Sequence, residues 1–317
     1  MIALLSHRLL GLLTTLLAVS LLVFMVMALL PGDPASIALG TSATPETLAA
    51  LRHQMGLDQP LMLRYGHWLL ALLRGDFGLS STYGVPAAGL IGERLAVTLP
   101  LAGLAILLSI LVAVPLGVAA AARRGGTIDR LALVFSQIGI ALPNFWVALL
   151  LILVFSTALN WMPAGGFPGW QAGGLTALRA LLLPAVALAL PQAAVLARVA
   201  RTAVLEVLHE DFIRTARAKG LSRRSVLYRH ALPNALPPLL TILGLQSTFL
   251  VAGAVLVENV FNLPGLGRLA YQALTQRDIV VMQDIVLLFA ALVIVTNFGV
   301  DLAYAAVDPR LREGGAP

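Results

Sequence analysis

Few residues of this chain could perform chemistry, and none stands in the pattern that the chemistry needs. The only lysine, Lys219, lies in RAKGLS, which lacks the spacing of the phosphate-binding loop G-x-x-x-x-G-K-[ST]. His209 begins HEDFI, which starts like the zinc motif H-E-x-x-H, but Ile213 stands where the second histidine is needed. The stretch GLSST lacks the last glycine of G-x-S-x-G. We therefore expect no catalytic residue, no metal site and no cofactor in the chain itself.

The basic residues are clustered instead. Six of the 21 Lys and Arg residues lie between 214 and 229, in the stretch RTARAKGLSRRSVLYRHALPNALP. Burying the nine charges of residues 206–236 in lipid would cost upward of roughly 20 kcal/mol on insertion scales. This segment must therefore lie outside the bilayer.

The elements around this segment are predicted to be membrane helices. The chain is 59% hydrophobic and only 11% charged, whereas soluble domains carry about 25% charged residues. Its apolar runs exceed the roughly 20 residues that cross a bilayer as a helix, and they lack the period-two alternation of a β-barrel. We expect an all-α polytopic protein with six transmembrane helices, at about 9–30, 97–122, 131–157, 181–204, 237–257 and 284–306.

Orientation follows from the Lys and Arg of the short connecting segments. With the N-terminus inside, fourteen of them lie on the inner side and three on the outer side, so both termini are predicted to be cytoplasmic. The positive charge thus reports topology, and we expect no nucleic-acid partner. The expected division is a first helix (1–30), an extracytoplasmic segment (31–96), a core (97–306) with a coupling loop (206–236) and an outer gate loop (258–283), and a tail (307–317).

Local signals divide the inner segment into two short helices. Asp211 is expected to cap the first, and Gly220 to end it in a left-handed conformation. Ser222 is expected to cap a second helix running to about Ala231, after which Pro233 forces the turn back to the membrane. In the outer segment, residues 61–72 have their large apolar side chains at helical spacing, which predicts an amphipathic helix on the membrane or the bundle.

The inner segment resembles the signature of the inner-membrane permeases of bacterial ABC importers, E-A-A, three residues, G, nine residues, I-x-L-P. Ala216, Gly220, Leu232 and Pro233 match, whereas the first two E-A-A positions are Arg214 and Thr215 and the I position is His230. That departure is similar to the dipeptide/oligopeptide/nickel subfamily. The resemblance extends along the chain through LLPGDPA, MGLDQPL, GDFGLS, PNFW, ENVFNLPGLGRLAYQAL and VDPRLR.

This resemblance implies a permease subunit that works by alternating access in the bacterial inner membrane, surrounded by lipid. Separate ABC ATPases would bind Mg-ATP, and an extracytoplasmic binding protein would deliver the substrate. Since six spans are few to enclose a peptide-sized path, a second, similar permease is expected, giving a heterodimer with two ATPases. The residues implied to couple to the ATPase are Phe212, Arg214, Thr215, Ala216, Arg217, Lys219, Gly220, Leu221, Leu232 and Pro233.

Two further groups of residues are candidates for the transport path. A non-helical gate at the outer mouth is expected from Glu258, Asn259, Phe261, Pro264, Gly265 and Gly267. Polar residues inside the spans line the path or bridge helices: Gln137, Asn144, Gln192, Gln246 and Asn297.

Two alternatives stay open. Within the subfamily, the short loop NWMPAGGFPGWQAGG is also similar to permeases for nickel or metal chelates, so peptides are not the only candidate substrate. An ion-coupled carrier would need ionisable groups within the bilayer, and its candidates are Asp301 and Glu258. Both lie near the ends of spans, where a cap or an inter-helix hydrogen bond is the simpler interpretation.

Overall fold

The computed structural model describes residues 2–29, 34–39, 43–54 and 56–307. Within these ranges there is no β-strand beyond a single bridge between Leu79 and Pro86, which confirms the all-α class. Part of LLPGDPA and most of VDPRLR, with the tail arginines 310 and 312, lie outside the described residues.

Six candidate spans are present in the described ranges if one bent pair of helices counts as a single span. They are α1 (Ile2–Leu29), α5 (Ala87–Ala122), the pair formed by α6 (Thr127–Ala141) and α7 (Asn144–Leu151) with its π-helical continuation η2 (Ile152–Ala158), α8 (Gly174–Leu208), α11 (Leu232–Val260) and α13 (Ile279–Val307). The shorter elements are α2 (Pro34–Leu39), α3 (Pro45–Gln54), α4 (Leu61–Leu73), η3 (Trp170–Ala172), α9 (Asp211–Ala218), α10 (Arg223–Ser225), η4 (Val226–Ala231) and α12 (Leu266–Gln276).

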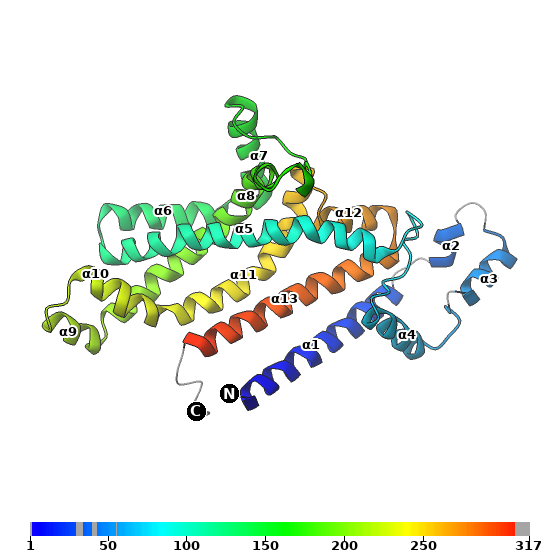
Figure 1. Cartoon of the computed structure of the whole chain (residues 1–317), viewed down its shortest axis with the longest axis horizontal. Coiled ribbons are helices and arrows are strands. Elements are labelled where there is room, and N and C mark those ends of the chain that lie inside the picture. Colours follow the sequence, from blue (N-terminus) through cyan, green and yellow to red (C-terminus); the bar gives the residue numbers. More distant parts are fainter. Residues whose placement is uncertain (1, 30–33, 40–42, 55, 308–317) are drawn as a thin grey trace.

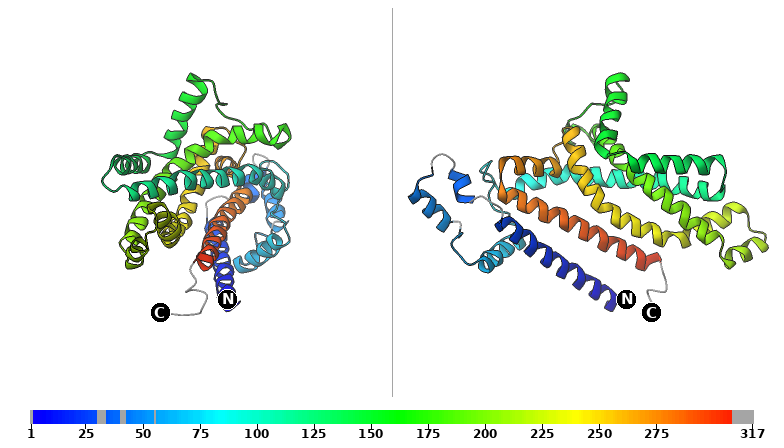
Figure 2. Two further views of the ribbon diagram at one scale, coloured as in Figure 1. Left: turned by 60° about the vertical axis from the view of Figure 1, so that its left-hand side comes forward. Right: turned by 180° about the vertical axis from the view of Figure 1, so that it is seen from behind.

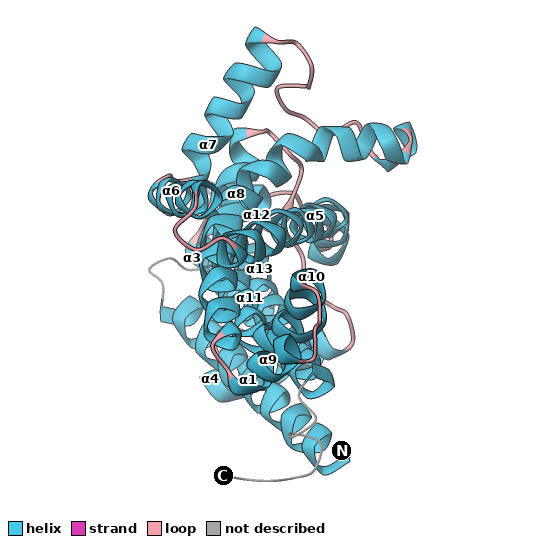
Figure 3. Cartoon of the chain, turned by 90° about the vertical axis from the view of Figure 1, so that its left-hand side faces the viewer, coloured by secondary structure: helices cyan, strands magenta, loops and turns pink. Residues whose placement is uncertain are grey.

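The third span differs from the straight helix expected at 131–157. It breaks at Leu142-Pro143, and its two halves are bent by 105°. Leu142 is extended (φ −87°, ψ 125°), because a residue before proline is pushed out of the helical region. As a result α7 begins against α8 and α11, and η2 beyond it projects away from the other spans (Figures 1 and 3). By contrast Pro115, Pro184 and Pro191 lie within continuous helices.

Helix α8 is the centre of the bundle. It packs against α5, α6, α7 and α11, and 72% of its most apolar stretch is buried. Many residues of its buried face are alanines, such as Ala185, Ala193 and Ala200, and small side chains let neighbouring helices approach closely. Helix α13 packs against α1, α11 and α12 (Figure 2).

The chain places its non-membrane segments at two opposite ends. One end, called here the inner end, carries α9, α10 and the connection between α5 and α6; the outer end carries α2 to α4 and α12 (Figures 1 and 2). Residues near the start of α1 and near the end of α13 also meet, since Arg8 forms an ion pair with Asp301 at 2.8 Å.

Helix α4 is the expected amphipathic helix of the outer segment, and it lies against α1. The rings of Tyr65 and Trp68 each lie 5.5 Å from the ring of Phe24, and the Tyr65 hydroxyl is 2.9 Å from the hydroxyl of Ser20.

Helix extends into two segments that were expected to lie outside the bilayer. Helix α5 begins at Ala87, inside the segment 31–96 assigned to the outer side, and the boundary of that segment stays a prediction. The outer gate loop 258–283 is largely helical, since α12 fills its centre and both α11 and α13 extend into it.

Candidate functional site

The inner coupling segment, defined as residues 209–233, connects α8 to α11. Its first helix, α9, begins at Asp211, so the expected cap is wrong: Glu210 is the N-cap residue, and its side chain makes no capping bond. Asp211 instead lies in the first turn, where a negative charge is favoured, and its carboxylate pairs with Arg214 at 3.0 Å.

The stop and restart between the two short helices are confirmed. Gly220 has φ +79°, a left-handed conformation that glycine adopts without cost, and a Cβ there would meet no atom within 4 Å. Ser222 then caps the next helix, its Oγ accepting a hydrogen bond from the Ser225 amide at 3.3 Å.

The turn expected at Pro233 is wrong, because the chain stays helical from Arg223 to Val260. Upstream of Pro233 the helix widens into the π-helical turn η4, and such a turn makes room for a proline ring that would clash in a regular helix. The Asn234 side chain donates a hydrogen bond to the carbonyl of His230 at 2.7 Å. The coupling segment is thus continuous with a transmembrane helix.

The coupling segment has an inward and an outward face. Ile213, Ala216 and Val226 are buried in one apolar cluster with residues of α5 and α8. Ala216 therefore packs against the chain's own bundle, and its place among the coupling residues stays a prediction. The outward residues are Phe212 (43% exposed), Arg214, Thr215, Lys219, Gly220 and Leu221. Arg217 is also exposed, Leu232 is half-buried, and Pro233 is exposed.

A buried ion pair fastens this inner end, and the sequence analysis missed it. Asp129 at the start of α6 accepts two hydrogen bonds from Arg201 of α8, one from Nε and one from Nη2, the latter at 2.9 Å. The other donor to Asp129 is the Gly125 amide, at 2.8 Å. The pair ties the α5–α6 connection to α8 seven residues before that helix ends. The only sequence signal was Arg201 itself, a charge within a long apolar helix.

The outer latch, defined as Glu258, Thr98 and residues 266–268, joins three helices at the other end. Glu258 of α11 is fully buried (0% exposed), and its carboxylate accepts hydrogen bonds from the Thr98 hydroxyl of α5 at 2.6 Å and from the amides of Gly267 at 2.7 Å and Arg268 at 3.1 Å. These amides open α12, where the helix dipole favours a negative charge. Thr98 completes the ring by accepting from the Leu266 amide at 2.8 Å.

The other expected gate residues are packed around this latch. Gly265 and Gly267 lie so close to Glu258 and to the backbone of Val255 that a Cβ at either position would overlap them. Phe261 is 1% exposed, and its carbonyl accepts from the Gly166 amide at 2.7 Å. Asn259 donates to the carbonyl of Val255 at 2.7 Å, and Pro264 is half-buried. The structure thus places Gly265 and Gly267 against Glu258, and the role of the whole set as a gate stays a prediction.

The polar residues expected along the path are only partly brought together. Gln246 of α11 and Gln192 of α8 are both buried, and the Gln246 amide donates to the Gln192 carbonyl at 3.2 Å. The side chains of Asn144 and Asn297 instead lie over two glycines of α11, Gly253 and Gly244 respectively. Gln137 is exposed on α6.

The two ionisable residues of the carrier alternative are both bonded within the chain, Glu258 in the latch and Asp301 to Arg8. This agrees with the simpler interpretation of each as an inter-helix hydrogen-bonding group. The sequence analysis did not consider Asp284, which lies near the outer end of α13, is 1% exposed and has neither carboxylate oxygen bonded.

Comparison with known proteins decides the family. The profile described as "Binding-protein-dependent transport system inner membrane component" matches residues 113–313, and a profile for the N-terminal part of such membrane components matches residues 1–93. The chain belongs to this permease family. Members are membrane subunits of bacterial ABC importers, with ATP hydrolysis in separate subunits, and this permease is a multi-pass protein of the bacterial inner membrane.

Full-length relatives are similar to the permease. A probable peptide ABC transporter permease protein, y4tP, of Sinorhizobium fredii is 40% identical over 306 residues, covering 96% of this chain and 98% of the relative. A putative peptide transport system permease protein of Brucella abortus is 42% identical, covering 98% and 99%. The glutathione transport system permease protein GsiC of Salmonella typhimurium is also 42% identical, covering 96% and 97%.

A solved structure shares the fold. A chain from the MetNI methionine ABC transporter in an inward-facing conformation superposes with a TM-score of 0.56 at 21% identity. The superposition covers 69% of the permease and 96% of that chain.

Proposed function

We propose that the permease is one of two membrane subunits of an importer for short peptides, and that the outward face of α9 couples it to an ATPase subunit. The names of the full-length relatives support the substrate, since they refer to peptides or to glutathione, itself a tripeptide. They favour peptides over the nickel or metal-chelate alternative. Mg-ATP would be bound and hydrolysed by the partner ATPases.

One observation carries the coupling proposal. The helix that begins at Arg223 in the coupling segment runs unbroken to Val260, next to the outer latch. Its 38 residues span about 57 Å at 1.5 Å per residue, which exceeds the thickness of a bilayer. A displacement of the inner end is therefore passed along one rigid element to Glu258. Alternating access then consists of ATP-driven movement of the coupling segment with a linked opening of the latch.

The outward face of α9 fits a protein partner. Phe212 is 43% exposed beside Arg214 and Lys219, and an exposed aromatic flanked by basic groups is typical of a binding hot spot. On the inward side the same helix is fixed by Ile213 and Ala216. A partner that pulls on the outer face would therefore carry the inner ends of α8 and α11 with it.

The projecting α7 and η2 support the second permease subunit. Trp146, Leu149 and Leu153 are 43%, 51% and 57% exposed on an arm bent 105° from α6. An arm that leaves its own bundle buries few of its own apolar side chains. A second bundle of the same kind would cover them, forming the expected heterodimer around a shared path.

Phe212→Ala tests the coupling proposal. Loss of a hot-spot aromatic should weaken co-purification with the ATPase subunit at least tenfold, since such residues contribute about 2 kcal/mol or more. The matched control is Tyr83→Ala, because Tyr83 is equally exposed (45%) but lies in the outer segment. Both variants should unfold at the wild-type temperature. Normal ATPase binding and uptake by the Phe212→Ala importer would refute the coupling surface.

The substrate is tested separately, by uptake in cells that depend on this permease. We expect accumulation of labelled dipeptide or glutathione to require the permease, and nickel accumulation to be unchanged by its deletion. The reverse result would replace peptides with nickel and leave the coupling proposal intact.

A further inference from the structure

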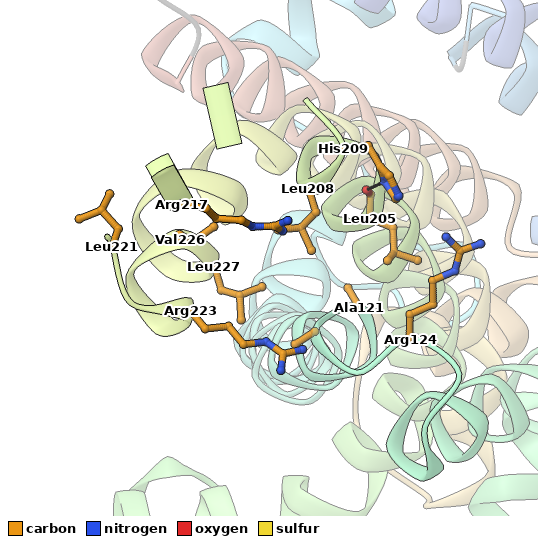
Figure 4. A pocket seen from close by; sticks show the side chains of 11 residues that line it. Ala121, Arg124, Leu205, Leu208, His209, Arg217, Leu221, Arg223, Val226 and Leu227 are labelled. Atoms are coloured by element: carbon orange, nitrogen blue, oxygen red, sulfur yellow. Dashed lines mark hydrogen bonds between the residues drawn. The ribbon is translucent and has the colours of Figure 1, made fainter. Parts of the chain in front are cut away.

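A pocket of about 560 Å³ lies at the inner end, between the coupling segment and the ends of α5 and α8 (Figure 4). Arg217 extends into it from the coupling segment toward Leu208 of α8, and Arg223 extends toward the end of α5 near Ala121, while Arg124 and His209 lie on the side across from them. The complete lining is Ala121, Ala122, Arg124, Leu205, Leu208, His209, Arg217, Leu221, Arg223, Val226 and Leu227.

The charge of this pocket is positive and is not balanced by its own lining. Three arginines line it, and no aspartate or glutamate does. Within the described part of the chain, the guanidinium groups of Arg124, Arg217 and Arg223 form no ion pair, whereas nearby Arg201 and Arg214 do. The charge of Arg124 also acts on Asp129, so Arg217 and Arg223 are the groups that favour an added anion with several oxygen acceptors, such as a phosphate.

Apart from His209, the remaining lining is apolar, which favours an anion that carries an apolar part. Leu205, Leu208 and Leu227 with the alanines of α5 form a surface that a free, fully hydrated phosphate would not use. The pocket also lies at the membrane boundary, because the uncharged run of α5 ends at Arg123 and the pocket begins at Ala121. Lipid phosphates lie at this depth, and basic pockets between helices on this side bind anionic head groups.

We propose that this pocket binds an anionic phospholipid of the inner leaflet. Its phosphate would pair with Arg217 and Arg223, and its glycerol and upper acyl carbons would lie on Leu205 and Leu208. The bound lipid would join α9 and α10 to the ends of α5 and α8, and so hold the coupling segment at a fixed angle to the bundle. This proposal needs no ATPase, so it stands or fails independently of the coupling surface.

Native mass spectrometry of the purified full-length permease tests the proposal directly. Dioleoyl phosphatidylglycerol is titrated in parallel with dioleoyl phosphatidylcholine, whose phosphate carries a compensating positive group. Phosphatidylglycerol should bind with a stoichiometry of one tight site, and phosphatidylcholine should not occupy that site. Equal binding of both lipids would overturn the proposal. Displacement of phosphatidylglycerol by inorganic phosphate at similar concentration would show a phosphate site and overturn the lipid assignment.

The variant Arg217→Gln with Arg223→Gln locates the site. It should weaken phosphatidylglycerol binding roughly 30-fold, which corresponds to about 1 kcal/mol for each basic group lost. The matched control is Arg224→Gln with Arg229→Gln, which removes the same charge from exposed residues of the same segment outside the pocket. We expect it to change binding less than about twofold. Arg217→Lys with Arg223→Lys, which keeps the charge, should retain most of the binding.

Two results would contradict the site. If both Gln pairs weaken binding equally, the lipid responds to the net charge of the segment and not to the pocket. If the pocket pair binds lipid normally but loses the ATPase subunit, its arginines serve the protein partner instead. Unfolding temperatures measured for all three variants separate loss of the site from loss of the fold.

Discussion

The inner and outer ends of the permease treat charge in opposite ways. At the outer end, the carboxylate of Glu258 is fully buried and accepts hydrogen bonds from three groups of α5 and α12. At the inner end, the basic residues of the coupling segment are exposed, and among the described residues only Arg214 of that segment forms an ion pair. The bonds to Glu258 offset the cost of burying its charge, whereas the exposed basic residues are solvated and available to a partner.

Both ends belong to the same long helix, which runs from Arg223 to Val260. The difference between them is therefore a difference in what each end of that helix holds. The outer end is hydrogen-bonded to other helices of the same chain, whereas the basic residues at the inner end are available to bind a partner. Substitutions at the outer end should act on folding, and those on the outward inner face should act on partner binding.

Glu258→Ala should have the largest effect on stability. It leaves the Thr98 hydroxyl and two α12 amides without their acceptor in a buried site, and each such group costs about 1–3 kcal/mol. We expect the free energy of unfolding, measured by titration with SDS, to fall by about 3 kcal/mol. Glu258→Gln keeps one acceptor oxygen and should lose less. A Glu258→Ala permease as stable as wild type would show that the latch does not hold the outer end.

The inner end also contains a buried charge, since Asp129 forms an ion pair with Arg201 there. Its contribution to stability can therefore be compared with that of an exposed ion pair at the same end. Asp129→Asn should lower the free energy of unfolding by about 2 kcal/mol, since Arg201 loses its counter-charge where the aspartate is only 4% exposed. Asp211→Asn is the control, because it breaks the ion pair with Arg214, whose side chains are 91% and 73% exposed. That change should cost less than about 0.5 kcal/mol. If both variants lost the same free energy of unfolding, burial would not explain the stability of the Asp129–Arg201 pair.

The sequence predicted most of the fold because apolar length and the distribution of charge are local properties. It missed the 105° bend at Leu142-Pro143, while Pro115 and Pro184 lie within continuous helices. All three prolines lie in apolar runs, so the run itself does not indicate which proline breaks its helix. The turn expected at Pro233 failed for a related reason, since a π-helical turn accommodates that proline.

For the candidate sites, the sequence identified the residues better than their contacts. The motif around Glu258 was assigned to the outer gate, but its bond to Thr98, 160 positions away, has no local signal. Gly220 and Ser222 behave as expected because their effects are confined to neighbouring residues. Which face of α9 turns outward depends on the bundle behind it. In the structure Ala216 is buried and Phe212 is exposed, and the motif alone did not indicate which of the two residues would be buried.

Gly220→Ala sharpens the comparison with the smallest change. The new methyl meets no atom, so its cost is only that of a left-handed alanine, about 1 kcal/mol. Gly75 in the outer segment has nearly the same φ, +80° against +79°, and similarly open surroundings, so Gly75→Ala should cost the same. The two variants should differ in coupling, since only Gly220 sets the angle between α9 and the long helix that begins at Arg223. We expect the importer with Gly220→Ala to hydrolyse ATP but to take up less peptide, and the importer with Gly75→Ala to transport normally. Equal uptake by both variants would show that the angle set at Gly220 does not affect transport.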